Sequence, residues 1–159
     1  MAARDPQNAV ADADSGSRLY DADFYEWCIT MAELLRAGRI DQVDIEHVAE
    51  EIEDLGKSQY RELDSRTTVL ILHLLKARYQ PGKHTRSWDQ TIRDQRIEIR
   101  GLLRYNPSLR RALAGAPARV YNDAVDKASN ESDLPADSFP PSCPFSPREI
   151  FGSELCPGE

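Results

Sequence analysis

Four side chains within two turns of one helical stretch have the types and spacing that could bind a metal ion. His47 and Glu51 form one i, i+4 pair, and Glu50 and Asp54 form another. Helical bundles build dinuclear metal sites from Glu-x-x-His motifs on two helices, together with further glutamates. Here the order is reversed, and no second copy occurs. We therefore treat the four only as weak metal candidates, beside the simpler interpretation of a solvated acidic face, and we predict no cofactor.

A second polar set lies further along the same stretch. On a helical wheel, Glu62, Arg66 and His73 share one edge of the apolar face. Polar groups at such an edge must form hydrogen bonds, or they destabilise the fold. One interpretation is a satisfied core histidine beside an ion pair. The other is a crevice, shared with Lys76, of a hydrolytic or metal-dependent enzyme, for which the first three are the catalytic candidates.

The charge of the chain is distributed unevenly. Residues 76–111 hold 10 Lys and Arg against 3 Asp and Glu, a net of +7, in a chain whose net charge is −7. Residues 1–75 hold 7 against 16, and residues 112–159 hold 3 against 8. A basic segment of this kind can bind phosphates, and the flanking Tyr79 and Trp88 could stack on bases. The candidates for binding nucleic acid or another anion are Lys76, Arg78, Lys83, Arg86, Arg93 and Arg96.

The basic segment has an alternative use. It could meet the acidic face of the long helix that precedes it, within the molecule or across a dimer. Its arginines recur at steps of three and four, which is typical of a helix face that is either solvated or turned toward an anion. These arginines are Arg93, Arg96, Arg100 and Arg104.

The element that must position these groups runs from Asp44 to Gln80. Its apolar residues repeat at steps of three and four, which predicts one long helix with a core-facing side, and residues 69–75 are apolar almost all round. Asp44 is a plausible N-cap, and Pro81-Gly82 ends the helix. The predicted core-facing residues are Ile45, Val48, Ala49, Ile52, Leu55, Leu63, Thr67, Leu70, Leu74 and Ala77.

This helix is long for the chain. A straight helix of this span measures roughly 54 Å, whereas a compact domain of this size is about 40 Å across. The helix therefore bends, or the molecule is elongated or dimeric. Gly56 could mark a mild bend, or it could let another helix pack closely, and we favour close packing with a mild bend.

Three more helices are expected around it. One covers residues 21–38, is capped by Asp21 or Asp23, and ends at Gly38. Another follows Ser87 as its cap and ends near residue 105. The last runs from Asn106 to about residue 129, and Pro117 should kink or interrupt it.

The two ends of the chain differ from this helical region. Residues 1–18 have the composition of a disordered tail rather than of a secretory signal. Residues 131–159 are rich in Pro and Ser but carry large apolar side chains, so we expect an arm that packs on the helices, with a short helix from Ser146-Pro147. The side chains expected to dock are Phe139, Phe145, Ile150 and Phe151.

Composition limits the class of protein. The 159 residues are 30% charged and 8% aromatic, which is typical of a water-soluble, helix-rich domain. No apolar run is long enough to cross a membrane, and three cysteines fit no even set of disulfides. We therefore predict a cytoplasmic protein with reduced thiols.

Several segments together resemble a bacterial family of domains of unknown function, family twenty-nine. The resemblance covers about residues 19–157 and implies an all-helical domain, but it implies no reaction. The segments that carry it are YDADFYEWC, LLRAGRIDQVDIEHVAEEIEDLGKSQYREL, HLLKARYQP, SWDQTIRDQR, NPSLRRAL and FPPSCPF.

These observations together predict an all-α fold. We expect an irregular four-helix bundle over residues 19–130, with one long and bent second helix, a tail before it, and the docked arm of residues 131–159 after it. The leading functional hypothesis is a non-enzymatic binding module that engages nucleic acid or an acidic partner through residues 76–104. The alternatives are an enzyme with a crevice at Glu62, Arg66 and His73, and a structural homodimer.

Overall fold

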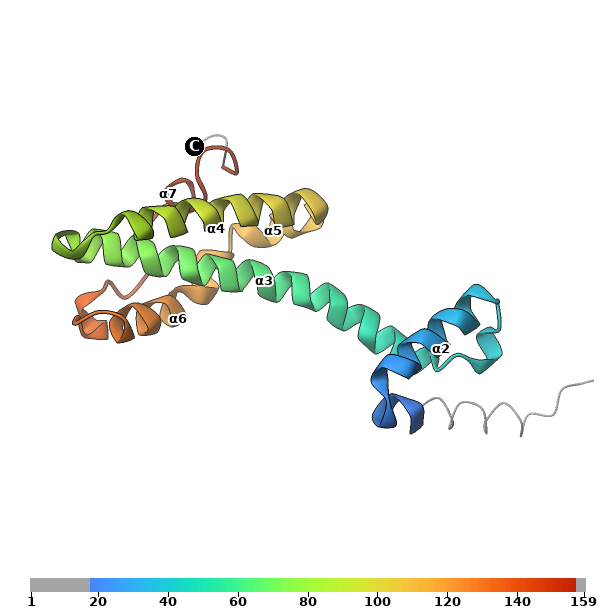
Figure 1. Cartoon of the computed structure of the whole chain (residues 1–159). Coiled ribbons are helices and arrows are strands. Elements are labelled where there is room, and N and C mark those ends of the chain that lie inside the picture. The colour runs from blue at the N-terminus through green and yellow to red at the C-terminus, as the bar shows by residue number, and fades with distance from the viewer. Residues whose placement is uncertain (1–17, 157–159) are drawn as a thin grey trace, which may run out of the picture. The chain divides into compact units, whose positions relative to one another are not determined.

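The structure, a computed structural model, describes residues 18–156, and every regular element among them is helical (Figure 1). The predicted all-α class is confirmed. Within the described part of the chain, no helix is both long and apolar enough to cross a membrane. Residues 18–22 are helical, and the main helices are α2 (Phe24–Arg36), α3 (Ile45–Tyr79), α4 (Arg86–Tyr105), α5 (Arg110–Leu113), α6 (Ala116–Asn130) and α7 (Pro147–Phe151).

The chain divides into two compact units, and the boundary falls inside α3, between Lys57 and Ser58. We call them the N-terminal unit and the C-terminal unit. This division cuts through the predicted domain of residues 19–130. The boundaries of that domain stay a prediction. The packing of four helices into one bundle also stays a prediction. Apart from Arg18, the predicted tail of residues 1–18 lies outside the described residues.

Local signals explain the start of the N-terminal unit. Asp23 caps α2 by accepting a hydrogen bond from the backbone N–H of Glu26 at 3.0 Å, so the second of the two predicted caps is the one used. Gly38 follows the helix at φ +69°, a conformation that favours glycine. Trp27 and Met31 of α2 pack with Val43 as the small core of this unit.

Asp44 begins α3, as predicted. Its carbonyl accepts from the N–H of Val48 at 3.0 Å, and its carboxylate accepts from the N–H of His47 at 3.4 Å. The expectation that the first turns of α3 face a core is wrong. Ile45, Ile52 and Leu55 are exposed by 58%, 66% and 67%, because only the side of α3 near Val48 packs on the small core.

No described residue outside α3 packs against Gly56. A Cβ added there would meet no heavy atom within 4 Å, so the close-packing explanation that we favoured is not supported. A bend at Gly56 stays a prediction.

The core of the C-terminal unit is built on the remainder of α3. Residues 70–72 and Leu75 are buried, as expected from their all-round apolar pattern, and α4 and α6 run along this part of α3 (Figure 1). Ile150 and Phe151 of α7 are fully buried in the same cluster, and Phe139 and Phe145 join it. The four apolar side chains expected to dock are therefore all part of this core.

Two predicted caps are wrong, and one predicted interruption is confirmed. Helix α4 begins at Arg86 after Thr85, two residues before the expected start, and no side chain caps it. The side chain of Asn106 donates to the carbonyl of Leu102 at 3.0 Å instead of capping the next helix. The predicted helix of residues 106–129 is broken between α5 and α6, because Pro117 fits only in the first turn of a helix.

Candidate functional site

The structure does not gather the four metal candidates. The hydroxyl of Tyr20 donates to Glu51 at 2.6 Å, and Lys57 pairs with Asp54 at 3.1 Å. His47 Nδ1 lies 2.7 Å from the carboxylate of Asp44. Within residues 18–156, no group of three or more His, Cys, Asp or Glu side chains is placed to hold a metal ion.

These contacts instead stabilise the N-terminal unit. The ring of Tyr20 stacks on His47 with centroids 4.2 Å apart, and its hydrogen bond to Glu51 raises the pKa of Tyr20 to about 12. The hydrogen bond that His47 donates to the carboxylate of Asp44 raises the pKa of His47 above its ordinary value of 6.5, and burial opposes this shift. His47 therefore has a structural role at the start of α3, because the Asp44 carboxylate that caps the helix also accepts a hydrogen bond from its imidazole.

The raised pKa of His47 predicts how the stability of the N-terminal unit changes with pH. A histidine whose folded pKa lies above its unfolded value stabilises the fold fully below about pH 6.5, and this contribution is lost as pH rises through the folded pKa. Replacing Asp44 by Asn should return the pKa of His47 toward 6.5 and remove this contribution. Proton NMR titration of His47 in the two proteins measures the shift, and equal pKa values would contradict the assignment.

The three catalytic candidates are only partly brought together. Arg66 pairs with Glu62 at 2.6 Å and reaches Glu98 of α4 at 3.5 Å. His73 lies apart from them, and its Nδ1 donates to the carbonyl of Val69 one turn earlier at 2.9 Å. This hydrogen bond agrees with the interpretation that His73 is a core histidine whose polar group has a partner.

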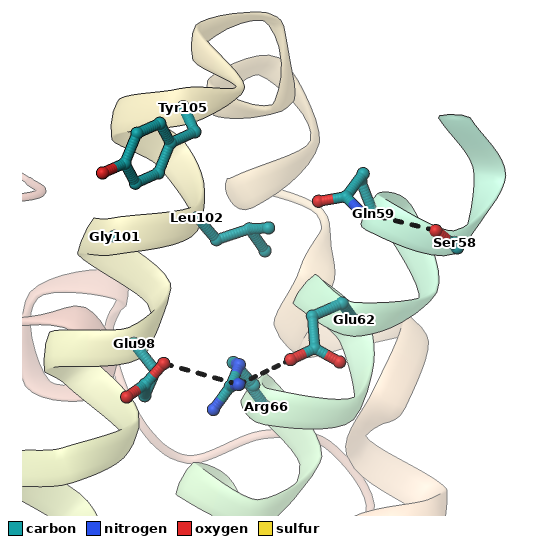
Figure 2. A pocket seen from close by; sticks show the side chains of 8 residues that line it. All are labelled: Ser58, Gln59, Glu62, Arg66, Glu98, Gly101, Leu102 and Tyr105. Atoms are coloured by element: carbon teal, nitrogen blue, oxygen red, sulfur yellow. Dashed lines mark hydrogen bonds and ion pairs between the residues drawn. The ribbon is translucent and has the colours of Figure 1, made fainter. Parts of the chain in front are cut away.

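Glu62 and Arg66 do line a cavity of about 450 Å³ between α3 and α4 (Figure 2). In Figure 2, Arg66 lies at its floor between the two glutamates, while Tyr105 stands on the α4 side. His73 is not part of its wall. The lining residues are Ser58, Gln59, Glu62, Arg66, Glu98, Gly101, Leu102 and Tyr105.

Most of the six anion-binding candidates are engaged by the segment that follows α6. Lys76 is buried, pairs with Glu131 at 2.8 Å, and lies 4.7 Å over the ring of Trp88. Lys83 pairs with Asp133, which lowers the pKa of that carboxyl group. Both lysines therefore neutralise acids of the net −5 segment 112–159, rather than acids of the long helix as we had considered.

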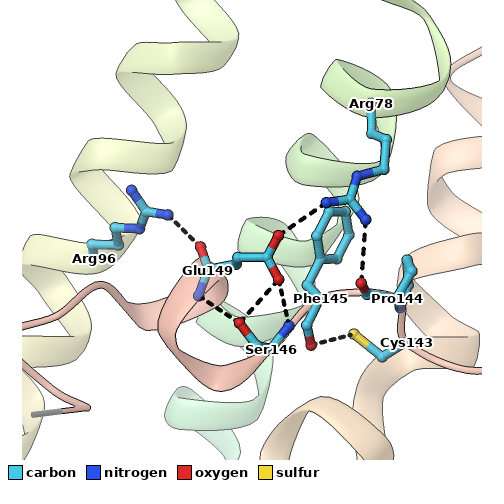
Figure 3. A network of polar contacts seen from close by, with 7 residues as sticks. All are labelled: Arg78, Arg96, Cys143, Pro144, Phe145, Ser146 and Glu149. Atoms are coloured by element: carbon cyan, nitrogen blue, oxygen red, sulfur yellow. Dashed lines mark hydrogen bonds and ion pairs between the residues drawn. The ribbon is translucent and has the colours of Figure 1, made fainter. Parts of the chain in front are cut away.

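Arg78 and Arg96 hold the arm from two sides (Figure 3). Arg78 pairs with Glu149 at 3.0 Å, donates to the carbonyl of Pro144 at 3.2 Å, and lies 4.3 Å over the ring of Phe145. Arg96 donates to the carbonyls of Ile150 at 2.8 Å and Glu149 at 2.5 Å. Their charge is used within the protein, and burial lowers the pKa of Arg96.

Four other arginines lie on one face of α4, where Arg100 is half-buried and the rest are exposed. Their helical spacing places Arg86, Arg93, Arg100 and Arg104 on one side, with Ile97 among them exposed by 53%. We call these five residues the α4 arginine stripe. Sequence reasoning missed Arg86 and Ile97 as its members, although the seven-residue steps from Arg86 to Arg93 to Arg100 were a readable signal.

The contacts of the stripe leave much of its charge available. Among residues 18–156, Arg93 donates only to the amide oxygen of Gln90 at 2.9 Å, and Arg104 lies over the ring of Tyr105 at 5.1 Å. Arg100 pairs with Glu154 at 2.6 Å, and Arg86 forms no hydrogen bond or ion pair with a described residue. The stripe is therefore one part of the basic segment whose charge can meet an external group.

The geometry defines an all-helical protein that carries a row of arginines on one face of α4. The chain belongs to the family described as Domain of unknown function DUF29, whose model matches residues 19–155. The resemblance stated from the sequence is thereby confirmed over nearly the same range. No curated protein and no solved structure matches the chain significantly.

Proposed function

We propose that this protein is a non-enzymatic interaction module whose α4 arginine stripe binds an acidic helix of a protein partner. The observation that carries the proposal is the position of Ile97. It is an exposed apolar side chain in the centre of a face whose other members are arginines. Apolar centres with charged surroundings are the common pattern of helix-to-helix recognition.

Two features favour a protein partner over nucleic acid. The aromatic side chains expected to stack on bases are occupied, because Tyr79 packs against Phe139 at 5.5 Å and Trp88 lies under Lys76. Phosphates also gain nothing from an isoleucine, whereas an apolar partner side chain would remove it from water. The four cations held by the arm are already paired, which reduces the positive surface that a phosphate backbone would need.

Charge reversal within the stripe tests the proposal. Arg93→Glu with Arg104→Glu should weaken binding of a labelled helical peptide, built with heptad isoleucines flanked by glutamates, at least about tenfold in fluorescence anisotropy. Arg96 is unsuitable for this test, because it holds the arm. The matched control is Arg110→Glu with Arg111→Glu, two exposed arginines outside the stripe, which should bind the peptide like the unchanged protein.

Labelled DNA and RNA, titrated across a salt series, serve as the competing probes. Steeply salt-dependent nucleic-acid binding that the stripe reversal abolishes, with no binding of the acidic peptide, would overturn the proposal in favour of a phosphate surface.

A second candidate, an enzyme, is favoured by one observation. Glu62, Arg66 and Glu98 line one cavity with the hydroxyl-bearing side chains of Ser58 and Tyr105, which is an arrangement able to hold a polar substrate. Turnover of ester or phosphoester substrates that disappears in Glu62→Gln would support it. Equal turnover rates in the unchanged protein and in Glu62→Gln would contradict a catalytic role of Glu62.

A further inference from the structure

Another cavity of the C-terminal unit lies between α4 and the segment that follows α7. Its volume is about 270 Å³, and three of the side chains that line it are arginines. Arg93, Arg96 and Arg100 recur along α4 at steps of three and four, which places them on one face of the helix. The segment after α7 contributes Glu154, so three positive groups and one negative group give the lining a net charge of +2. The cavity therefore favours an anion.

The segment after α7 is held against this face of α4. The carbonyl of Gly152 accepts from the N–H of Cys156 at 3.3 Å, which folds the segment into a turn. Glu154 in this turn pairs with Arg100 at 2.6 Å. From the α4 side, Arg96 donates to two backbone carbonyls of α7 at 2.8 and 2.5 Å. Contacts between the two walls therefore form the cavity within the fold itself.

The three arginines keep N–H donors that these contacts do not use. Toward residues 18–156, Arg96 bonds through Nε and Nη2, Arg100 through Nη1, and Arg93 through Nη2. Burial lowers the pKa of Arg96, and the positive charge of Arg100 lowers it further, so these two guanidinium groups are close enough to repel each other. An anion that accepts hydrogen bonds from both groups would reduce this repulsion.

The chemistry of the cavity suits a carboxylate better than a phosphate. The chain itself places a carboxylate, that of Glu154, on Arg100, and a planar carboxylate matches the paired donors of a guanidinium group. Ile97 also lines the cavity and is exposed by 53%, so a hydrocarbon chain would gain a contact that inorganic phosphate cannot make. The volume lies just below the roughly 300–1,000 Å³ of drug-sized ligand sites, which indicates a small molecule.

We infer that this cavity binds a small dicarboxylate, whose two negative charges balance the lining and whose carbon chain lies against Ile97. Its carboxylates accept the N–H donors that the three arginines leave unused. The inference goes beyond the proposed function, because the ligand is a small molecule rather than a helix. Arg93, Ile97 and Arg100 belong both to this cavity and to the α4 arginine stripe.

Titration of the full chain with glutarate, followed by ¹H–¹⁵N NMR, tests the inference. The backbone signals of Gly152 and Ser153 and the Nε–H signal of Arg96 should shift and reach saturation. Arg100→Gln should raise the dissociation constant for glutarate at least about tenfold, because it removes a positive charge and its donors. Arg104→Gln is the matched control. It removes the same charge from α4 outside the cavity, and should change the constant by less than about twofold.

A further variant and a second probe separate recognition from damage to the cavity. Glu154→Gln should tighten glutarate binding by about threefold or more, because it releases Arg100 from its partner and makes the lining more positive. A variant that merely disturbed the cavity would weaken binding instead. Butyrate, which carries one carboxylate on a similar carbon chain, should bind at least about tenfold more weakly than glutarate.

Three outcomes would overturn the inference. They are the lack of a saturable shift with glutarate, equal glutarate binding in Arg100→Gln, and tighter binding of inorganic phosphate than of glutarate. None of these titrations contains the acidic peptide that tests the proposed function. If the peptide binds the α4 arginine stripe but glutarate does not bind, only the dicarboxylate site is wrong. If glutarate binds and the peptide does not, only the proposed function is wrong.

Discussion

Replacing Phe151 by Ala should reduce the free energy of unfolding of the C-terminal unit by about 3–5 kcal/mol, the usual cost of truncating a fully buried phenylalanine. Phe151 is the largest side chain in the described chain with essentially no exposure, and Ile150 beside it is equally buried. The capping box of Ser146 and Glu149 fixes the start of α7, which points both residues into the core. The arm therefore acts as part of the core rather than as a detachable cover.

Urea denaturation followed by circular dichroism measures this loss. Tyr105→Ala is the matched control, because it also truncates an aromatic side chain of the same unit but one that is 77% exposed. It should change the free energy of unfolding by no more than about 0.5 kcal/mol. If the two variants lose similar stability, α7 is not an integral part of the core.

The helices of this fold could be predicted because their signals are local. The N-cap at Asp23, the positive φ at Gly38 and the break before Pro117 each depend on only a few neighbouring residues. The wrong prediction for the start of α4 also came from a local signal. Ser87 is a good cap by residue type, but the carbonyl of Thr85 already accepts from the N–H of Trp88 at 3.1 Å, and the hydroxyl of Ser87 pairs with that of Thr85 at 2.9 Å.

Long-range pairing could not be predicted in the same way. Lys83 and Asp133 are 50 residues apart, and Arg78 and Glu149 are 71 apart. The charge distribution indicated that the basic segment needs acids, but the long helix and the segment after α6 both offered them. Only the fold selects between the two, because α7 and the residues after α6 pack beside the end of α3 and along α4.

Helical periodicity identifies a face of a helix but not what covers it. Ile45 and Ile52 follow the same apolar pattern as Leu63 and Leu70, yet the first two are exposed and the last two are fully buried. The same limit applies to the candidate crevice. Glu62 and His73 share an edge of α3, but 11 residues separate them, about 16 Å along the axis, so one cavity reaches only the first.

Lys76 should prove to be structural rather than part of an anion-binding surface. Reversing it to Glu should lower the free energy of unfolding by roughly 2–4 kcal/mol, because a buried carboxylate would then face Glu131 and the ring of Trp88. The expected loss is below that of a fully buried ion pair, because the side chain of Glu131 is 51% exposed and is screened by water.

A double-mutant cycle measures this role. Lys76→Glu combined with Glu131→Lys should recover part of the loss, since the pair is re-formed with its signs exchanged. Lys76→Met should cost less than Lys76→Glu, because it keeps the apolar stem against Trp88 and buries no new charge. If Lys76→Glu instead leaves stability unchanged and only weakens binding of an anion, Lys76 belongs to a ligand surface. The pairing of the basic segment with the arm would then be incidental to the fold.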